Sequence, residues 1–271
     1  MTKTELEDAV HEMAVDEYLR GLKMPGAQRE YRELARRAAA AGTSPVVFLE
    51  EVLACEMESR RRNQIAQRLR DAHLPYPKNL EDFDFTLAPS VPKAKILDLA
   101  RGDFVRDHEN LVCIGPSGLG KTHLGIGICR QVIQQGYRAR FVTVSSLMNE
   151  LLAAQSRFEL PKCLRQWSRF DLIMVDEIGY VPLSTDGARL LFQFFAEMYE
   201  RRSLLLTTNL EFSRWPDVFG DPVMTSALLD RLTHRAHLVA LSGESYRFRQ
   251  ARNRAREGEL SPVAAQAVSG V

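Results

Sequence analysis

The stretch from Gly115 to Thr122 (GPSGLGKT) constrains the fold most tightly, because it fits the phosphate-binding pattern G-x-x-x-x-G-K-[ST]. A short apolar run, residues 110–114, precedes it and reads as a buried strand; residues 122–134 read as the following helix. A chance match of the four fixed letters is expected in roughly 1% of chains of this length. The flanking strand and helix make an accidental match less credible still.

This order of elements places phosphate groups at a helix N-terminus, where unpaired N–H groups and the helix dipole favour anions. The sequence therefore predicts a site for ATP with Mg²⁺. Lys121 is expected at the β- and γ-phosphates and the Thr122 hydroxyl at the metal. The predicted nucleotide-binding residues are Gly115, Pro116, Ser117, Gly118, Leu119, Gly120, Lys121, Thr122 and His123.

Composition is that of an ordinary soluble globular protein, with 45% apolar and 26% charged residues among 271 and a net charge of +1. The four cysteines are widely separated and form no C-x-x-C pair, so we expect no zinc site. Cys113 and Cys129 lie within apolar runs, so we expect them to be small buried side chains in a reducing compartment. The charged N-terminus lacks the apolar core of a signal peptide, and no apolar run is long enough to cross a bilayer. These features predict a cytoplasmic protein without membrane contact.

The pattern of elements predicts four regions. Residues 1–75 read as a small all-α domain, interrupted at Pro25-Gly26 and again at residues 42–45. Residues 76–92 are rich in proline and read as a linker, in which Phe83 and Phe85 either fill the core at the domain junction or contact the nucleotide base. Residues 93–257 read as an α/β domain with a central parallel sheet, and residues 258–271 as a disordered tail.

Two further strands of the α/β domain end in polar residues that suit phosphate chemistry. The apolar run 170–175 ends in Asp176-Glu177, which matches a Walker B element: Asp176 would support the metal and Glu177 would polarise the attacking water. Asn209 follows the strand 203–208, where it would orient that water or sense the γ-phosphate. The alternatives are carboxylates that merely cap a strand and an Asx turn at Asn209.

Arginines gather on the second and third predicted helices. Either they form a solvated face with acidic partners such as Glu56 and Glu58, or they bind the phosphates of nucleic acid. Two such helices in one small domain favour nucleic acid, through Arg29, Arg32, Arg36, Arg60, Arg61, Arg62, Arg68 and Arg70. A second basic patch follows near the C-terminus, at Arg247, Arg249, Arg252, Arg254 and Arg256.

Arg231 and Arg235 lie four residues apart on a predicted helix, residues 226–235, and so share one face. Each of them either forms a surface ion pair, for example with Asp230, or serves as an arginine finger in the nucleotide site of the next subunit.

Taken together, these elements resemble the AAA+ ATPases, and more narrowly the IstB-like helper ATPases of insertion-sequence transposition. The resemblance runs from about residue 22 to residue 256. The segments that carry it are LPYPKNLEDFDF (74–85), GPSGLGKTHL (115–124), DLIMVDEIGYVPL (171–183), LLTTNLEFSRW (205–215), VFGDPV (218–223), LLDRLTHRAH (228–237) and GESYR (243–247).

The resemblance implies a helical DNA-binding region, ATP-dependent assembly into oligomers on duplex DNA, and stimulation of a partner transposase. It also implies that Asn209 is sensor 1 and that Arg231 is the arginine finger, acting in trans. Arg247 lies where a second sensor would be sought, but too little chain follows Leu241 for the helical lid that carries it, so Arg247 receives no catalytic role.

Two alternatives remain open. A DnaC-like helicase loader would favour single-stranded DNA and stack bases on aromatic side chains, yet residues 27–74 offer only Tyr31 and Phe48, which favours duplex binding. A small-molecule P-loop kinase would need an acceptor site and a lid. If contacts to the DNA backbone dominate, we expect little base specificity and strong salt sensitivity.

Overall fold

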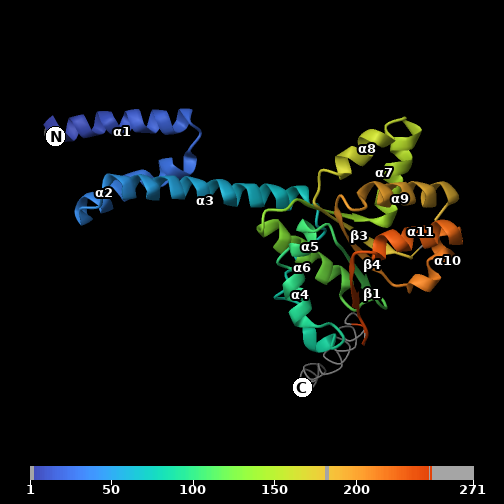
Figure 1. Cartoon of the computed structure of the whole chain (residues 1–271). Coiled ribbons are helices and arrows are strands. Elements are labelled where there is room, and N and C mark those ends of the chain that lie inside the picture. The colour runs from blue at the N-terminus through green and yellow to red at the C-terminus, as the bar shows by residue number, and fades with distance from the viewer. Residues whose placement is uncertain (1–2, 181–182, 244, 246–271) are drawn as a thin grey trace, which may run out of the picture. The chain divides into compact units, whose positions relative to one another are not determined.

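A computed structural model describes residues 3–180, 183–243 and 245. The chain divides into two compact units, Met1–Gln67 and Arg68–Val271, and each is described by itself (Figure 1). No helix among the described residues is both long and apolar enough to span a membrane.

The first unit consists of three helices, α1 (Lys3–Gly21), α2 (Pro25–Ala41) and most of α3 (Pro45–Asp71). Proline begins α2 at its first turn, and Gly42, with φ of 62°, ends it in the left-handed conformation. A small apolar core holds the helices together, formed by Ala27, Tyr31, Leu34 and Val52. The all-α character predicted from the helical periodicity is confirmed.

A buried carboxylate joins α3 to the start of α2. Glu56, only 3% exposed, accepts hydrogen bonds from the backbone N–H groups of Gly26 (2.7 Å) and Ala27 (3.2 Å), which have no partner within their own helix. It also pairs with Arg60 at 2.7 Å. Burial tends to raise the pKa of Glu56, but the hydrogen bonds from Arg60, Ala27 and Gly26 outweigh it and leave the pKa below its usual value.

The second unit is built on a five-stranded sheet in the order β2-β3-β4-β1-β5, in which all paired strands are parallel. This confirms the predicted α/β class with a central parallel sheet. The strands are β1 (Asn110–Ile114), β2 (Ala139–Thr143), β3 (Leu172–Ile178), β4 (Ser203–Thr208) and β5 (Ala236–Ala240). Strand β4 lies between β1 and β3, so it separates the two strands that end in the phosphate-binding loop and in Asp176-Glu177.

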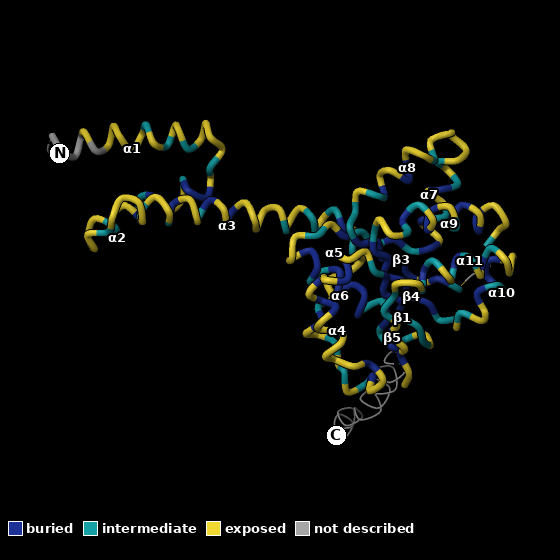
Figure 2. Tube along the Cα trace, viewed as in Figure 1, coloured by how far each residue is buried: buried dark blue, intermediate teal, exposed yellow. Residues whose placement is uncertain are grey.

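Helices cover both faces of the sheet, whose three central strands β1, β3 and β4 are mostly buried (Figures 1 and 2). Along β3, Ile173 and Val175 pack into the cluster formed with α7, α9 and α11, whereas Met174 packs towards α6, beside Gly125. The longer helices are α6 (Lys121–Gln134), α7 (Val144–Ser156), α8 (Leu160–Trp167), α9 (Thr185–Met198) and α11 (Pro222–Thr233). The shorter ones are α4 (Lys93–Leu99), α5 (Asp103–Arg106) and α10 (Pro216–Phe219), with 3₁₀ turns η1 (Phe85–Leu87) and η2 (Phe212–Arg214).

The expected burial of Cys113 and Cys129 is confirmed. Both are fully buried, and burial raises the pKa of each thiol to about 12.

Residues 76–92, predicted to be a linker, lie within the second unit and pack on α6. The Asn79 carbonyl contacts His123 Nε2 at 2.8 Å, and its side-chain oxygen accepts from Arg130 Nε at 2.9 Å. Leu80 is 3% exposed and approaches Gly127 so closely that a Cβ there would lie 2.6 Å from Leu80 Cδ2. These contacts join residues far apart in sequence, which the local proline signals do not reveal. The predicted tail, 258–271, lies outside the described residues.

Candidate nucleotide-binding site

The loop between β1 and α6 has the backbone that its glycines predict. Gly118 and Gly120 adopt φ of 83° and 89°, in the left-handed region that side chains rarely enter. A Cβ on Gly120 would also lie 2.6 Å from Cε2 of Phe83, a residue of the segment 76–92. Both the turn and the close approach therefore require glycine at this position.

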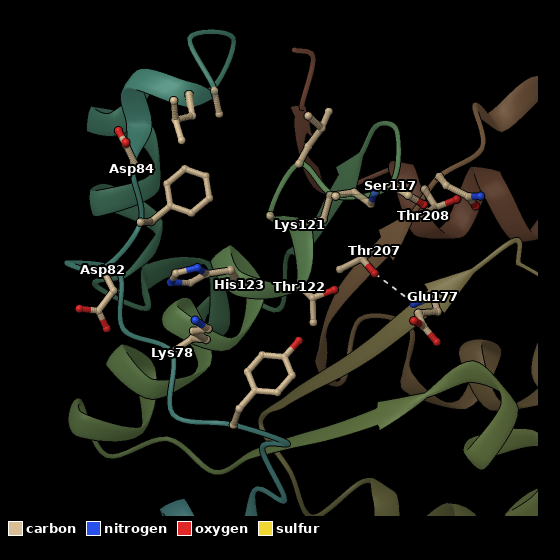
Figure 3. A pocket seen from close by; sticks show the side chains of 18 of the residues that line it. Lys78, Asp82, Asp84, Ser117, Lys121, Thr122, His123, Glu177, Thr207 and Thr208 are labelled. Atoms are coloured by element: carbon tan, nitrogen blue, oxygen red, sulfur yellow. Dashed lines mark hydrogen bonds between the residues drawn. The ribbon is translucent and has the colours of Figure 1, made fainter. Parts of the chain in front are cut away.

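Lys121 opens α6 beneath this loop and is 8% exposed (Figure 3). Its ammonium group donates hydrogen bonds to the carbonyl oxygens of Gly115 (2.6 Å) and Pro116 (2.8 Å). The charge is thus held inside the loop that surrounds phosphate in proteins of this pattern.

Thr122 and Asp176 come together at the ends of α6 and β3, as the motifs predict. The Thr122 hydroxyl lies 3.0 and 3.1 Å from the two carboxylate oxygens of Asp176, which is 4% exposed. Burial raises the pKa of the Asp176 carboxyl, although the hydrogen bonds from Thr207 and Thr122 oppose the shift. A hydroxyl and a carboxylate side by side are oxygen ligands of the kind that Mg²⁺ prefers.

A β-bulge directs Asp176 and Glu177 to different places. Val175 pairs with Leu206 and Ile178 pairs with Thr208, so Asp176 and Glu177 together oppose the single residue Thr207. Glu177 has φ of 67°, and its side chain is exposed and lines the cavity, whereas Asp176 stays buried.

Thr207 stabilises this bulge. Its hydroxyl accepts a hydrogen bond from the Glu177 N–H at 3.1 Å (Figure 3) and donates to a carboxylate oxygen of Asp176. Sequence reasoning missed this residue, because its importance depends on the pairing of β3 with β4. The two threonines that end the strand were the only local signal.

Asn209 lies directly after β4 and lines the same cavity. The alternative prediction of an Asx turn does not describe the geometry, since the hydroxyl of Thr208 makes the turn contacts with Leu210, accepting from its N–H at 3.1 Å and donating to its carbonyl at 3.2 Å. The Asn209 side-chain oxygen is buried and has no hydrogen-bond partner among the described residues. A buried amide oxygen without a partner is costly and suits a site completed by a ligand.

These groups surround a cavity of about 480 Å³, within the range of small-molecule sites. Its second wall comes from the segment 76–92, through Tyr76, Lys78, Asp82, Phe83, Asp84, Leu87 and Ala88. The Phe83 ring packs edge-on against His123, with ring centroids 5.4 Å apart, and against Phe85 at 4.8 Å. Phe83 therefore lines the cavity, and Phe85 supports it from behind.

A tyrosine closes the cavity on the side of β3. The Tyr180 hydroxyl, two residues beyond the strand, forms a hydrogen bond with the Ser117 hydroxyl of the phosphate-binding loop. Sequence reasoning gave Tyr180 no role, because nothing local indicates this contact.

The family described as IstB-like ATP binding protein matches residues 18–254. The chain belongs to this family.

Relatives with this chain's architecture occur in bacterial insertion sequences. The "Insertion sequence IS5376 putative ATP-binding protein" of Geobacillus stearothermophilus is 36% identical over 238 residues, which cover 88% of this chain and 95% of the relative. The "Insertion sequence IS21 putative ATP-binding protein" of Pseudomonas aeruginosa is 35% identical over 243 residues, which cover 90% and 91%.

Solved structures share the fold of the second unit. AMPPCP-bound DnaA from Aquifex aeolicus superposes with a TM-score of 0.54 at 15% identity, covering 70% of this chain and 58% of that chain. DnaI superposes with a TM-score of 0.52 at 18% identity, covering 62% and 96%. Together with the strand order, these likenesses establish the P-loop fold of the AAA+ type.

Neither candidate arginine finger of this IstB-like chain is among the described residues that line the cavity. Arg231 lies over the ring of Phe192, 5.1 Å from its centroid, and donates to the Ala227 carbonyl at 3.1 Å. Arg235 pairs with Glu109 at 3.6 Å. Arg247 and the basic patch that it begins lie outside the described residues.

The arginines of the helical unit are partly neutralised by acidic neighbours. Four of the eight predicted DNA contacts have carboxylate partners: Arg32 with Glu12 and Asp16, Arg36 with Glu33, Arg60 with Glu56, and Arg62 with Glu58. Arg29 donates to the Ser59 hydroxyl at 3.0 Å, and Arg61 is exposed. The interpretation as a solvated face thus accounts for part of the cluster.

Proposed function

We propose that this protein is an ATPase that assembles on duplex DNA under the control of its bound nucleotide and assists a transposase. The observation that carries the proposal is the convergence of Lys121, Thr122, Glu177 and Asn209 on one cavity, with Asp176 hydrogen-bonded to Thr122 beside it. The membership of the family described as ATP-binding supports the nucleotide, and the insertion-sequence relatives support the biological setting.

In this proposal the loop and Lys121 bind the phosphates of ATP. The Lys121 ammonium, which contacts the loop carbonyls of Gly115 and Pro116, turns to the β- and γ-phosphates when they enter. Thr122 and Asp176 hold Mg²⁺, which supplies charge neutralisation for the phosphates when it is bound. The wall that contains Phe83, which packs against Gly120 of the loop, receives the base and ribose.

Glu177 orients and polarises the attacking water, since its carboxylate is exposed in the cavity and its backbone is fixed by Thr207. Asn209 contributes its side-chain oxygen or amide to the same water or to the γ-phosphate. A finger completes the site from a neighbouring subunit, and Arg231 is our candidate because it takes the finger's place in the pattern of the family. Arg231 and Arg235 both make contacts within this chain. Such a finger can accelerate hydrolysis by about 10³–10⁵-fold, so the isolated subunit should hydrolyse ATP slowly.

Duplex DNA is the proposed surface for assembly. The exposed arginines of the helical unit supply phosphate contacts, and those that already have acidic partners contribute less. The association should therefore weaken steeply with added salt and show little preference for sequence.

The test is to size the protein by light scattering with and without duplex DNA, in ATP, in ADP and without nucleotide. We expect a large complex only with duplex and ATP, and its loss in Arg231→Ala; Val223→Ala, an exposed change also on α11, is the matched control. A chain that stays monomeric on duplex with ATP would refute the assembly, and an absence of nucleotide binding would refute the site itself.

A further inference from the structure

The turn after α7 presents an aromatic ring to solvent. Phe158 is 96% exposed, the most exposed of the large apolar side chains that the structure describes. It lies in the short connection between α7 and α8, with Arg157 before it and Glu159 after it. A phenylalanine on a monomer surface usually covers some of its area on neighbours, and this one covers almost none.

The backbone at Phe158 adds to the anomaly. Its N–H bonds to the Gln155 carbonyl at 3.0 Å, and the next N–H, of Glu159, bonds to the Ala154 carbonyl at 2.8 Å. This Schellman pattern places Phe158, with φ of 57°, where helices usually carry glycine. The left-handed backbone conformation therefore disfavours phenylalanine here. The side chain is also not buried, so the hydrophobic effect does not offset this cost. Backbone strain that stabilises no contact within the fold indicates a functional role.

The helix that follows Phe158, α8, is anchored to the core. Trp167 anchors α8 to the core: it is 3% exposed, packs edge-on against Phe194 with centroids 5.7 Å apart, and donates from Nε1 to Glu150 at 3.0 Å. The exposed ring is thus carried by a turn that is held at both ends.

The charged residues that follow or precede Phe158 closely in the sequence are mainly positive, and Glu150 of α7 already accepts a hydrogen bond from Trp167. Arg157, Arg165 and Arg169 are exposed, while the only acidic residue between positions 156 and 169, Glu159, is paired with Lys162 at 3.1 Å. DNA offers the matching chemistry, because its phosphates attract guanidinium groups and its bases offer apolar faces to an aromatic ring.

We propose that the Phe158 turn, residues 156–159 with Arg165 of α8, is a second DNA-contacting surface, in which the Phe158 ring inserts against the bases of a duplex and Arg157 and Arg165 bind flanking phosphates. This inference rests on the proposed function, to which it adds a contact made by the ATPase unit itself. The other occupant that an exposed ring suits is a partner protein, and the test separates the two.

The test compares Phe158→Gly with the wild type in duplex binding over a series of salt concentrations. We expect affinity to fall at least about fivefold at every salt concentration, because the stacking of a base on an aromatic ring is lost while the phosphate contacts remain. The slope of log affinity against log salt should not change. In Arg165→Gln that slope should decrease by about 0.9, the contribution of one phosphate contact.

Thermal stability provides the second readout. Since glycine accepts the left-handed conformation, Phe158→Gly should melt at the same or a higher temperature, whereas a side chain with a structural role would lower it. Binding of a fluorescent ATP analogue should be unchanged. Val223→Ala, which removes another apolar side chain that is 80% exposed, should change neither DNA nor nucleotide binding.

Insertion can be observed directly with 2-aminopurine in the duplex, whose fluorescence rises when it is unstacked; the rise should be absent with Phe158→Gly. Wild-type affinity and fluorescence in Phe158→Gly would overturn this inference and leave the proposed DNA binding intact. Unchanged DNA binding with a loss of transposase binding would assign the ring to a protein partner instead. If the wild type binds no duplex at all, both the DNA part of the proposed function and this inference fall, while ATP hydrolysis stands as a separate result.

Discussion

Replacing Thr207 by valine tests whether the β-bulge positions Asp176 and Glu177 for the proposed ATP hydrolysis. Valine has nearly the same shape as threonine but lacks the hydroxyl, and the position is 1% exposed. It removes the hydroxyl that accepts from the Glu177 N–H at 3.1 Å and donates to Asp176. Packing should therefore be retained, and only the two hydrogen bonds are lost.

The cost follows from these two bonds. A hydrogen bond to a charged group is worth about 1.5–3 kcal/mol, and a buried N–H left without a partner costs about 1–3 kcal/mol. Because Glu177 is exposed and its backbone can relax, we expect the free energy of unfolding to fall by about 2–4 kcal/mol. Glu177 would no longer be held at its unusual φ, and a displacement of about 1 Å typically reduces turnover by about 100-fold.

The assay combines urea unfolding with steady-state ATP hydrolysis. Thr207→Ser keeps the hydroxyl and should retain most of the activity. Ser203→Ala removes a buried hydroxyl at the opposite end of the same strand, where it bonds to the Phe104 carbonyl at 3.2 Å, and should lower stability by about 1 kcal/mol without affecting turnover. Full activity in Thr207→Val would refute the reasoning that the hydroxyl positions Glu177.

Four further outcomes are expected. Lys121→Ala should abolish binding of a fluorescent ATP analogue, since the loop loses its charge; retained affinity would exclude the lysine from the site. Glu177→Gln should bind ATP normally but hydrolyse it at least about 100-fold more slowly in a phosphate-release assay. Gly120→Ala should weaken nucleotide binding measured by calorimetry, because φ of 89° and the nearby Phe83 ring both oppose a Cβ. Wild-type stability should fall as pH drops below 4.5, because Glu56 has a lowered pKa when folded and must be protonated against its hydrogen bonds. In pH-series melting, Glu56→Gln should therefore show a weaker loss of stability in acid than the wild type.

The sequence predicted the parts of the site that depend on local pattern. The strands 110–114 and 203–208 coincide with β1 and β4, because both are apolar runs bounded by polar residues or glycine. The strand 170–175 was placed too early, since β3 continues through Asp176 and Glu177 to Ile178. A bulge interrupts its pairing but not its direction, and no single-strand pattern reveals a bulge.

The parts that escaped prediction depend on contacts between distant segments. Prolines around Tyr76 and Pro89 indicate irregular structure correctly but cannot show that the segment packs on α6 and forms one wall of the cavity. Helix α8 was also missed, because eight residues are too few for a clear period. Similarly, the predicted helix 226–235 begins earlier, at Pro222, where Asp221 caps it by accepting from the Val223 and Met224 N–H groups.

Positive φ angles distinguish Glu177 and Phe158 from residues in ordinary helix-ending turns. Six residues other than glycine have positive φ in the described part of the chain: Lys23, His73, His108, Phe158, Glu177 and Glu200. Five of them follow a helix, where a left-handed residue satisfies the last carbonyl groups. Glu177 alone among them lies inside a strand, so the end of a helix cannot explain its positive φ. The positive φ instead belongs to the bulge that exposes its carboxylate in the cavity. Phe158 does end a helix. At such a position the polar side chain of a lysine, histidine or glutamate is well solvated by water, whereas the ring of Phe158, which is 96% exposed, is not. The same argument therefore supports the proposed role of Glu177 in the chemistry of the site and the proposed contact of Phe158 with a ligand outside the chain.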